Sequence, residues 1–296
     1  MKNKSLLGHL FAVICVLVWG TTFIVSKSLM RSLTPVQLMW LRFVIAYLSL
    51  WALYPHWQLR FREEPKFLLI SLFGNTLYFL AENSALGLTQ TSNVSILVAT
   101  APLITALMLR FTHGEKLTRL QRLGFAVTFI GVVFVVLNGV FVLRLHPRGD
   151  ILALAAAGCW AVYTILIRRV TEKYNSFLIT RKVMFYGIVT STPLLIFTKS
   201  TLPVKELLNI GSVAGLFYLG VIGSAICYVM WNTSISRLGA LKASIYINAI
   251  PLVTLLFGAI FLNETVTAAG IFGMLLVIGG LLLSNLSIEK KTKIKD

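Results

Sequence analysis

The chain is poor in charged residues, and poorest in acidic ones. Of its 296 residues only 10 are Asp or Glu, against 27 Lys or Arg, and charged residues make up 12% of the chain. Soluble globular domains average about 25% charged residues, so the composition excludes an ordinary soluble enzyme or binding domain. The three cysteines, Cys15, Cys159 and Cys227, lie far apart inside apolar stretches. This spacing excludes a disulfide framework and a cysteine-based metal site.

Sequence signatures of catalysis and of ATP use are absent as well. No G-x-x-x-x-G-K-[ST] phosphate-binding sequence occurs, and no polar segment is long enough to form a nucleotide-hydrolysing domain. The four histidines, His9, His56, His113 and His146, lie at the ends of apolar stretches, without a carboxylate partner at a catalytic spacing. We therefore expect no enzymatic activity, no metal and no cofactor.

Apolar residues make up 57% of the chain instead. They form ten runs, each close to the roughly 20 residues that a membrane-spanning helix needs. The runs are about 8–29, 35–54, 67–87, 92–111, 121–142, 150–169, 178–198, 212–236, 241–262 and 268–287. Backbone polar groups must be hydrogen-bonded in hydrocarbon, which leaves helices or a closed barrel. The runs are too long for barrel strands and do not alternate, so we predict an all-α integral membrane protein with ten transmembrane helices.

The basic residues gather at one set of run ends. If the N-terminus is cytoplasmic, the cytoplasmic ends hold most of the 27 Lys and Arg, including Arg60, Arg110, Arg122 and Arg237. This positive-inside bias predicts that both termini are cytoplasmic. The net charge of +17 therefore does not indicate a nucleic-acid partner. The basic C-terminal tail is expected to attract anionic membrane lipids.

The sequence contains an internal repeat, in which positions 74–131 match positions 223–280 at an offset of 149 residues. Matching pairs include Gly74 with Gly223, Asn83 with Asn232, Pro102 with Pro251 and Gly131 with Gly280. Each half would hold five spans, and an odd number of spans reverses the direction of the chain. We therefore predict two inverted five-helix repeats, 1–142 and 143–296, with a site between them.

Several motifs are spread along both halves. They are Trp19-Gly20-Thr21-Thr22-Phe23, Pro35 followed by Leu41-Arg42-Phe43, Ala85-Leu86, Pro102, Gly114-Glu115-Lys116-Leu117-Thr118, Trp160, Pro251 and Asn263-Glu264-Thr265-Val266-Thr267. Together they resemble the EamA-type unit of the drug/metabolite transporter superfamily, over nearly the whole chain. The resemblance implies a basket of ten helices around a central cavity, working by alternating access. Proteins similar in this way are mostly bacterial inner (plasma) membrane exporters of amino acids and related metabolites.

Polar side chains are costly inside a membrane and therefore mark candidate sites. Asn75, Tyr78 and Glu82 are three and four residues apart, which places them on one helical face. Glu82 is the only acidic residue well inside a run. Because hydrocarbon penalises its charged form, it could take up a coupling proton near neutral pH or pair with a substrate ammonium. A structural partnership with Arg42, or a position at the outer interface, is the open alternative.

The other candidate substrate-binding residues are aromatic or polar and lie inside other runs. They are Trp19, Phe23, Arg42, Trp160, Tyr163, Tyr228, Trp231 and Asn248. The aromatic members would wall a cavity and could bind a cation through their ring faces, and Arg42 could bind a substrate carboxylate. Helix packing, interfacial anchoring and outward snorkelling of Arg42 are the alternatives. Pro102 and Pro251 predict matching kinks that act as hinges, or that simply set the helix shape.

Three further patterns predict structural contacts. The repeated Asn83 and Asn232 are expected to bond neighbouring helices. Thr118 and Gln121 have the spacing of a helix capping box. Glycines in the last run of each half, such as Gly131 in the first half, predict close helix packing.

These observations together predict a secondary active transporter that exports amino acids or related small metabolites. Its partners would be that small-molecule substrate, membrane lipids and, if Glu82 is the coupling group, protons. An importer or exchanger of another metabolite, such as a nucleotide-sugar or an organic cation, is the alternative. The preference for export comes from the resemblance alone, and the residues do not indicate an oligomeric state.

Overall fold

The computed structural model describes residues 2–56, 58–89, 91–114, 118–137, 146–198, 201–262 and 267–292. The first half of the chain contains α1 (Lys2–Leu29), α2 (Pro35–Leu53), α3 (Glu64–Ser71), the π-helix η1 (Leu72–Leu77), α4 (Tyr78–Leu88), α5 (Thr91–Val98), α6 (Ala101–His113) and α7 (Arg119–Leu137). The second half contains α8 (Pro147–Thr171), α9 (Ser176–Phe197), α10 (Val204–Leu207), α11 (Ile210–Phe217), the π-helix η2 (Tyr218–Ile226), α12 (Cys227–Leu238), α13 (Ala240–Ile245), the 3-10 helix η3 (Tyr246–Ala249), α14 (Ile250–Leu262) and α15 (Ala268–Thr292).

The predicted all-α class is confirmed for the described residues, whose regular structure is entirely helical. Among them, four helices are long and apolar enough to cross a membrane: Ser5–Leu29, Pro35–Leu53, Pro147–Thr171 and Ile210–Leu238. The described parts of the other apolar runs are mainly helical too, several of them in shorter pieces. Ten spans in two inverted repeats stay a prediction. The predicted boundary at 142–143 and the motif residues 115–117 and 263–266 lie outside the described residues.

A departure from the α-helix recurs at matching positions of the sequence repeat. Adding the 149-residue offset to η1, which covers Leu72–Leu77, gives 221–226, and these positions lie inside η2, which covers Tyr218–Ile226. A π-helix has i→i+5 hydrogen bonds, so it rotates the residues before it relative to those after it. Both halves therefore change their helical register just before the segment that carries the candidate site residues.

The two repeated prolines also lie at matching departures from the α-helix. α5 ends at Val98 and α6 begins at Ala101, so that Pro102 lies in the first turn of a new helix. The 3-10 helix η3 leads in the same way into α14, with Pro251 in its first turn. A proline is tolerated there because the first backbone N–H groups of a helix have no partner within it. The kinks expected at both prolines are therefore changes from one helix to the next.

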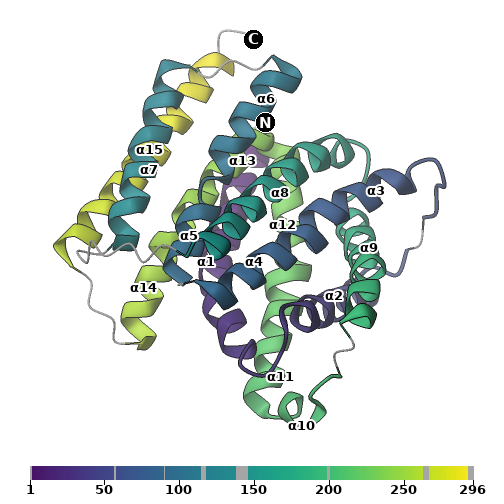
Figure 1. Cartoon of the computed structure of the whole chain (residues 1–296). Coiled ribbons are helices and arrows are strands. Elements are labelled where there is room, and N and C mark those ends of the chain that lie inside the picture. The colour runs from purple at the N-terminus through teal and green to yellow at the C-terminus, as the bar shows by residue number, and fades with distance from the viewer. Residues whose placement is uncertain are drawn as a thin grey trace.

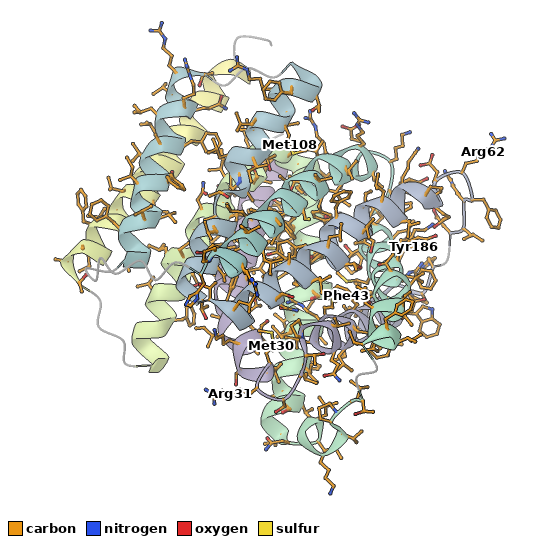
Figure 2. The ribbon with its side chains drawn as sticks, viewed as in Figure 1. Met30, Arg31, Phe43, Arg62, Met108 and Tyr186 are labelled. Atoms are coloured by element: carbon orange, nitrogen blue, oxygen red, sulfur yellow. The ribbon has the colours of Figure 1, made fainter. Side chains whose placement is uncertain are left out.

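The helix bundle brings the two halves of the chain into contact (Figure 1). α1 packs against α12, α2 against α9 and α4 against α8, while α7 and α15 run side by side. Each of these pairs joins a helix of the first half to one of the second. The main core therefore lies between the halves, and Figure 2 shows one of its fully buried side chains, Phe43 of α2, inside the bundle.

Two predicted structural contacts are confirmed. The Thr118 amide donates to Gln121 Oε1 at 2.8 Å, and the Gln121 amide donates to Thr118 Oγ1 at 3.1 Å, which completes a capping box at the start of α7. Gly131 of α7 lies against α15, where a Cβ would stand 2.6 Å from the backbone nitrogen of Val277. A side chain at Gly131 would force the two helices apart, so the glycine permits their close approach.

Candidate functional site

A small cavity lies among the central helices. Helices of both halves contribute to its walls. The lining residues are Trp19, Thr22, Phe23, Arg42, Tyr78, Phe79, Glu82, Val98, Trp160, Tyr228, Ile247 and Ile250. Seven of the predicted substrate-binding residues are among them: Trp19, Phe23, Arg42, Tyr78, Glu82, Trp160 and Tyr228. We call this space the central cavity.

Arg42 brings a positive charge to the central cavity from α2. Its side chain is only 3% exposed. The Nε atom of Arg42 donates to Ser224 Oγ at 2.5 Å, and its guanidinium carbon lies 4.3 Å from the centre of the Phe79 ring. Neither contact uses the two terminal nitrogens, which can bind a carboxylate with two parallel hydrogen bonds. The guanidinium is therefore fixed in place with its carboxylate-binding edge unused by these contacts.

Glu82 brings an acidic side chain to the same cavity from α4. It is as deeply buried as Arg42, and its carboxyl lies beside the hydroxyl of Tyr78 and within electrostatic reach of Arg42. The structure describes both charged residues and does not place them in ion-pair contact, so a direct salt bridge is not what satisfies Glu82. Buried charges are costly without partners, and a ligand between these two groups could partner both.

Aromatic residues, among them Trp19, Trp160 and Tyr228, form much of the remaining lining of the central cavity. The ring centroid of Trp160 lies 5.3 Å from that of Trp19 and 5.0 Å from that of Tyr78. Trp19 Nε1 and the Tyr228 hydroxyl each donate to a π-helix carbonyl at 2.9 Å, in η2 and η1 respectively. Trp160 Nε1 is buried and has no hydrogen-bond partner among the described residues.

Asn75 does not line the central cavity, although its spacing from Tyr78 and Glu82 predicted a shared face. Asn75 lies in η1, whereas Tyr78 and Glu82 lie in α4, and the i→i+5 turns rotate Asn75 away from that face. Its Nδ2 donates to the Val183 carbonyl of α9 at 2.9 Å. Asn75 therefore connects the two halves of the chain.

Three other predicted residues also lie outside the central cavity. The Tyr163 hydroxyl donates to Asn232 Oδ1 at 2.7 Å, behind the wall. Trp231 is fully buried, with its ring centroid 5.1 Å from that of Trp19. Asn248 lines a different cavity, next to α7. Tyr163 and Trp231 support the wall from behind, because the lining aromatic residues pack against them.

The prediction that the repeated asparagines bond neighbouring helices is confirmed. Asn83 Nδ2 donates to the Pro35 carbonyl of α2 at 3.3 Å. Asn232 Nδ2 donates to Thr180 Oγ1 of α9 at 3.0 Å. Each asparagine therefore holds its helix to an adjacent one, outside the central cavity.

Phe79 is the lining residue with the clearest role that sequence reasoning missed. It lies under the Arg42 guanidinium, and its position three residues before Glu82 in one α-helix is a signal that could have found it. Val98, Ile247 and Ile250 also line the cavity. No sequence signal marks them, because apolar residues occupy most positions of these runs.

A second polar cluster joins the start of α3 to α9. Glu64 forms an ion pair with Lys182 and accepts a hydrogen bond at 2.9 Å from the hydroxyl of Tyr186, which Figure 2 labels. Burial raises the pKa of Glu64, but these hydrogen bonds and one from a backbone amide outweigh burial and leave the pKa below its ordinary value. Arg181 donates to backbone carbonyls just beyond the end of α2. Arg181 and Lys182 thus bind polar groups near the end of α2 and the start of α3, whereas Arg42 lines the central cavity.

The central cavity therefore combines one positive group, one acidic group and several ring faces. This set suits a small ligand that carries both charges and an apolar or aromatic part. Within the described ranges, no group of three or more His, Cys, Asp or Glu side chains is placed to hold a metal ion.

Comparison with known proteins agrees with transport across a membrane. The sequence profile of the EamA-like transporter family matches residues 6–137 and 147–286 of this chain. An uncharacterized transporter of Archaeoglobus fulgidus is 28% identical over 292 residues, which cover 96% of this chain and 98% of that protein. The uncharacterized transporter YcxC of Bacillus subtilis is 26% identical, covering 99% of this chain and 97% of that protein.

One relative carries a more specific name, and one solved structure shares the fold. The Escherichia coli protein named "Probable amino-acid metabolite efflux pump" is 26% identical over 300 residues, covering 96% of each chain. A crystal structure with 20% sequence identity matches with a TM-score of 0.76, covering 98% of this chain and 99% of the other. The helical arrangement described above is thus one that a solved protein also has.

Proposed function

The chain belongs to the EamA-like transporter family, and from this we propose that it is a secondary active transporter that exports amino acids or related small metabolites across the inner membrane. The observation that carries the proposal is the central cavity, where the buried Arg42 and Glu82 face one aromatic-walled space. The name of the Escherichia coli relative supports the substrate class and the direction of transport.

The cavity residues suggest how an amino acid would bind. Its carboxylate would meet the terminal nitrogens of Arg42, and its ammonium would meet Glu82. Its side chain would lie against Trp19, Phe23 and Trp160, which line the same space. Each buried charge would then gain an opposite charge from the substrate, which favours a zwitterion over a ligand with one charge.

Transport would follow alternating access between the two halves of the chain. We propose ten membrane-crossing helices in two inverted repeats, with both termini cytoplasmic and with hinges at the helix changes before Pro102 and Pro251. Glu82 would be the coupling group, because a proton and a substrate ammonium would compete for its carboxylate. No nucleotide hydrolysis is needed if the proton gradient drives export.

An organic cation is the second candidate substrate. The observation that favours it is the set of ring faces around Glu82, since Trp19, Tyr78, Trp160 and Tyr228 line the cavity together. Aromatic faces attract quaternary and protonated amines. Such a substrate would use Glu82 and the rings but would not need Arg42.

The test is efflux from proteoliposomes that contain the purified protein and a panel of labelled amino acids. Efflux is followed with and without a pH gradient for the native chain, for Glu82→Gln and for the control Glu172→Gln, which removes an exposed acidic group beyond α8. We expect the native chain and the control to export at least one amino acid in a pH-dependent way, and Glu82→Gln to lose the pH response. Unchanged coupling in Glu82→Gln would rule out Glu82 as the coupling group. The absence of efflux for every amino acid would contradict the substrate class and direct the search to nucleotide-sugars and organic cations.

A further inference from the structure

A second and larger cavity lies beside α7, apart from the residues that line the central cavity. Its volume is about 250 Å³. The lining residues are Ala99, Thr100 and Leu103 at the junction of α5 and α6, Arg122, Phe125, Ala126 and Phe129 of α7, and Asn248 of η3. We call this space the α7 groove.

The α7 groove follows one face of α7. Its four α7 residues, Arg122, Phe125, Ala126 and Phe129, have the i, i+3, i+4, i+7 spacing of a single helical face. Ala126 is the smallest of them and lies in the middle of this face. In Figure 1, α7 and α15 form a pair at one side of the molecule, and the α7 groove lies where α7 meets the α5–α6 junction and η3.

The surroundings of the α7 groove are apolar and open. Its own rim residues Leu103 and Phe129 are exposed, as are Leu123 and Ile130 on the neighbouring faces of α7. In a membrane protein such side chains face hydrocarbon rather than water. The side chains that line an empty apolar cavity lack dispersion contacts on one side, and such a cavity offers water few hydrogen-bond partners. The contents that suit it are therefore hydrocarbon chains from the bilayer.

The positively charged lining residue of the α7 groove, Arg122, lies at one end of the groove. Arg122 is in the first turns of α7, next to the exposed Arg119 and at the end of the bundle that the positive-inside pattern places in the cytoplasm. Basic pockets between membrane helices on this side attract anionic lipid headgroups. The deeper Thr100 hydroxyl already donates to the Leu97 carbonyl at 2.6 Å. The one cation of the lining set is thus at the depth of a headgroup, with apolar side chains at the depth of an acyl chain.

We propose that the α7 groove binds an anionic phospholipid, with its phosphate on Arg122 and an acyl chain along Phe125, Ala126 and Phe129. The lipid would fill the space between the α7–α15 pair and the α5–α6 junction. The competing occupant is the transported metabolite, because Asn248 adds a polar group at the deep end of the groove. The two occupants differ in the residues and ligands on which they depend.

The experiment is native mass spectrometry of the full chain after reconstitution in bilayers of phosphatidylglycerol and phosphatidylcholine. It compares the native chain with Arg122→Gln, with Ala126→Phe, which fills the hollow, and with the control Arg62→Gln. Arg62 is an exposed arginine at the same end of the bundle, and Figure 2 shows it on the opposite side of the molecule from α7. Thermal melting in detergent checks that each variant is folded, and Ala126→Leu replaces Ala126→Phe if the larger side chain prevents folding.

We expect the native chain and Arg62→Gln to retain phosphatidylglycerol selectively. Arg122→Gln should lower this selectivity about fivefold, the order of effect of one basic residue at an anionic membrane surface, and the filled variant should lose the bound lipid of either class. Equal effects of Arg122→Gln and Arg62→Gln would overturn the proposal, because they would show a general surface-charge effect. Unchanged lipid retention in the filled variant, or displacement of the lipid by a transported amino acid, would also overturn it. Retention is read without transport, so this result is independent of the proposed export activity.

Discussion

Arg42→Lys is the substitution that most sharply separates charge from geometry in the central cavity. Lysine keeps the positive charge but has no second nitrogen edge and no planar group to lie 4.3 Å over the Phe79 ring. It also cannot reproduce the 2.5 Å hydrogen bond from Arg42 Nε to Ser224 Oγ while reaching a ligand. The variant should therefore bind a substrate carboxylate through one contact instead of two.

The expected size follows from the contact that is lost. A hydrogen bond to a charged group contributes about 1.5–3 kcal/mol, and about 1.4 kcal/mol corresponds to a tenfold change in affinity. The KM for an amino acid should therefore rise about 10- to 150-fold in Arg42→Lys. An amine that has the same side chain but no carboxylate does not use the lost contact, so its KM should change little.

The assay is uptake by counterflow in proteoliposomes, with an amino acid and its decarboxylated amine measured in parallel. Ser224→Ala is the matched control, since it loosens the Arg42 side chain without altering the charge, and it should raise the KM by less than Arg42→Lys does. Equal losses for the amino acid and the amine would refute the assignment of the carboxylate to Arg42. An unchanged KM for both compounds would refute any contact between Arg42 and the substrate.

Three further changes test contacts in the central cavity and elsewhere in the helix bundle. Tyr228→Phe removes a buried 2.9 Å hydrogen bond and should lower the free energy of unfolding by about 0.5–1.5 kcal/mol, read as a lower melting temperature in detergent. Gly131→Ala should lower the melting temperature more than Gly158→Ala, because a Cβ at Gly131 meets the backbone of α15 whereas one at Gly158 has nothing within 4 Å. The pKa of Glu64 is lowered in the folded protein, so its bonds with Lys182 and other donors stabilise the protein above the ordinary glutamate pKa of about 4.3 and are lost as the pH falls through the lowered value. The native chain should therefore lose more stability than Glu64→Gln below about pH 4.3, and identical melting profiles of the two proteins would contradict this.

The sequence is most informative where membrane physics limits the choices. Glu82 and Arg42 could be singled out because a charged side chain inside an apolar run is costly and therefore rare. Both line the central cavity, together with Trp19 and Trp160. Their contact with a substrate stays a prediction.

The prediction for Asn75 depended on a regular helix between Asn75 and Tyr78. A π-helix occupies that position, and nothing in the sequence of 72–77 signals i→i+5 hydrogen bonds. Tyr163 and Trp231 show a different limit. In a helix surrounded by other helices, every face meets protein, so the sequence cannot tell which aromatic residues line a cavity and which support it from behind.

Asn248 could not be placed from the sequence because of the 3-10 helix η3. The predicted span 241–262 assumes a continuous α-helix, but Tyr246–Ala249 has a tighter turn. Asn248 therefore lines the α7 groove, while the adjacent Ile247 lines the central cavity. The break also changes the interpretation of Pro251, which begins a helix instead of bending one.

An electron cryomicroscopy structure of the protein, bound to the amino acid that efflux identifies, would show directly where the substrate lies. We expect ligand density in the central cavity, with the carboxylate on Arg42, the ammonium on Glu82 and the side chain against Trp160. Density at another location, or a ligand in the central cavity that touches neither charged residue, would contradict this expectation.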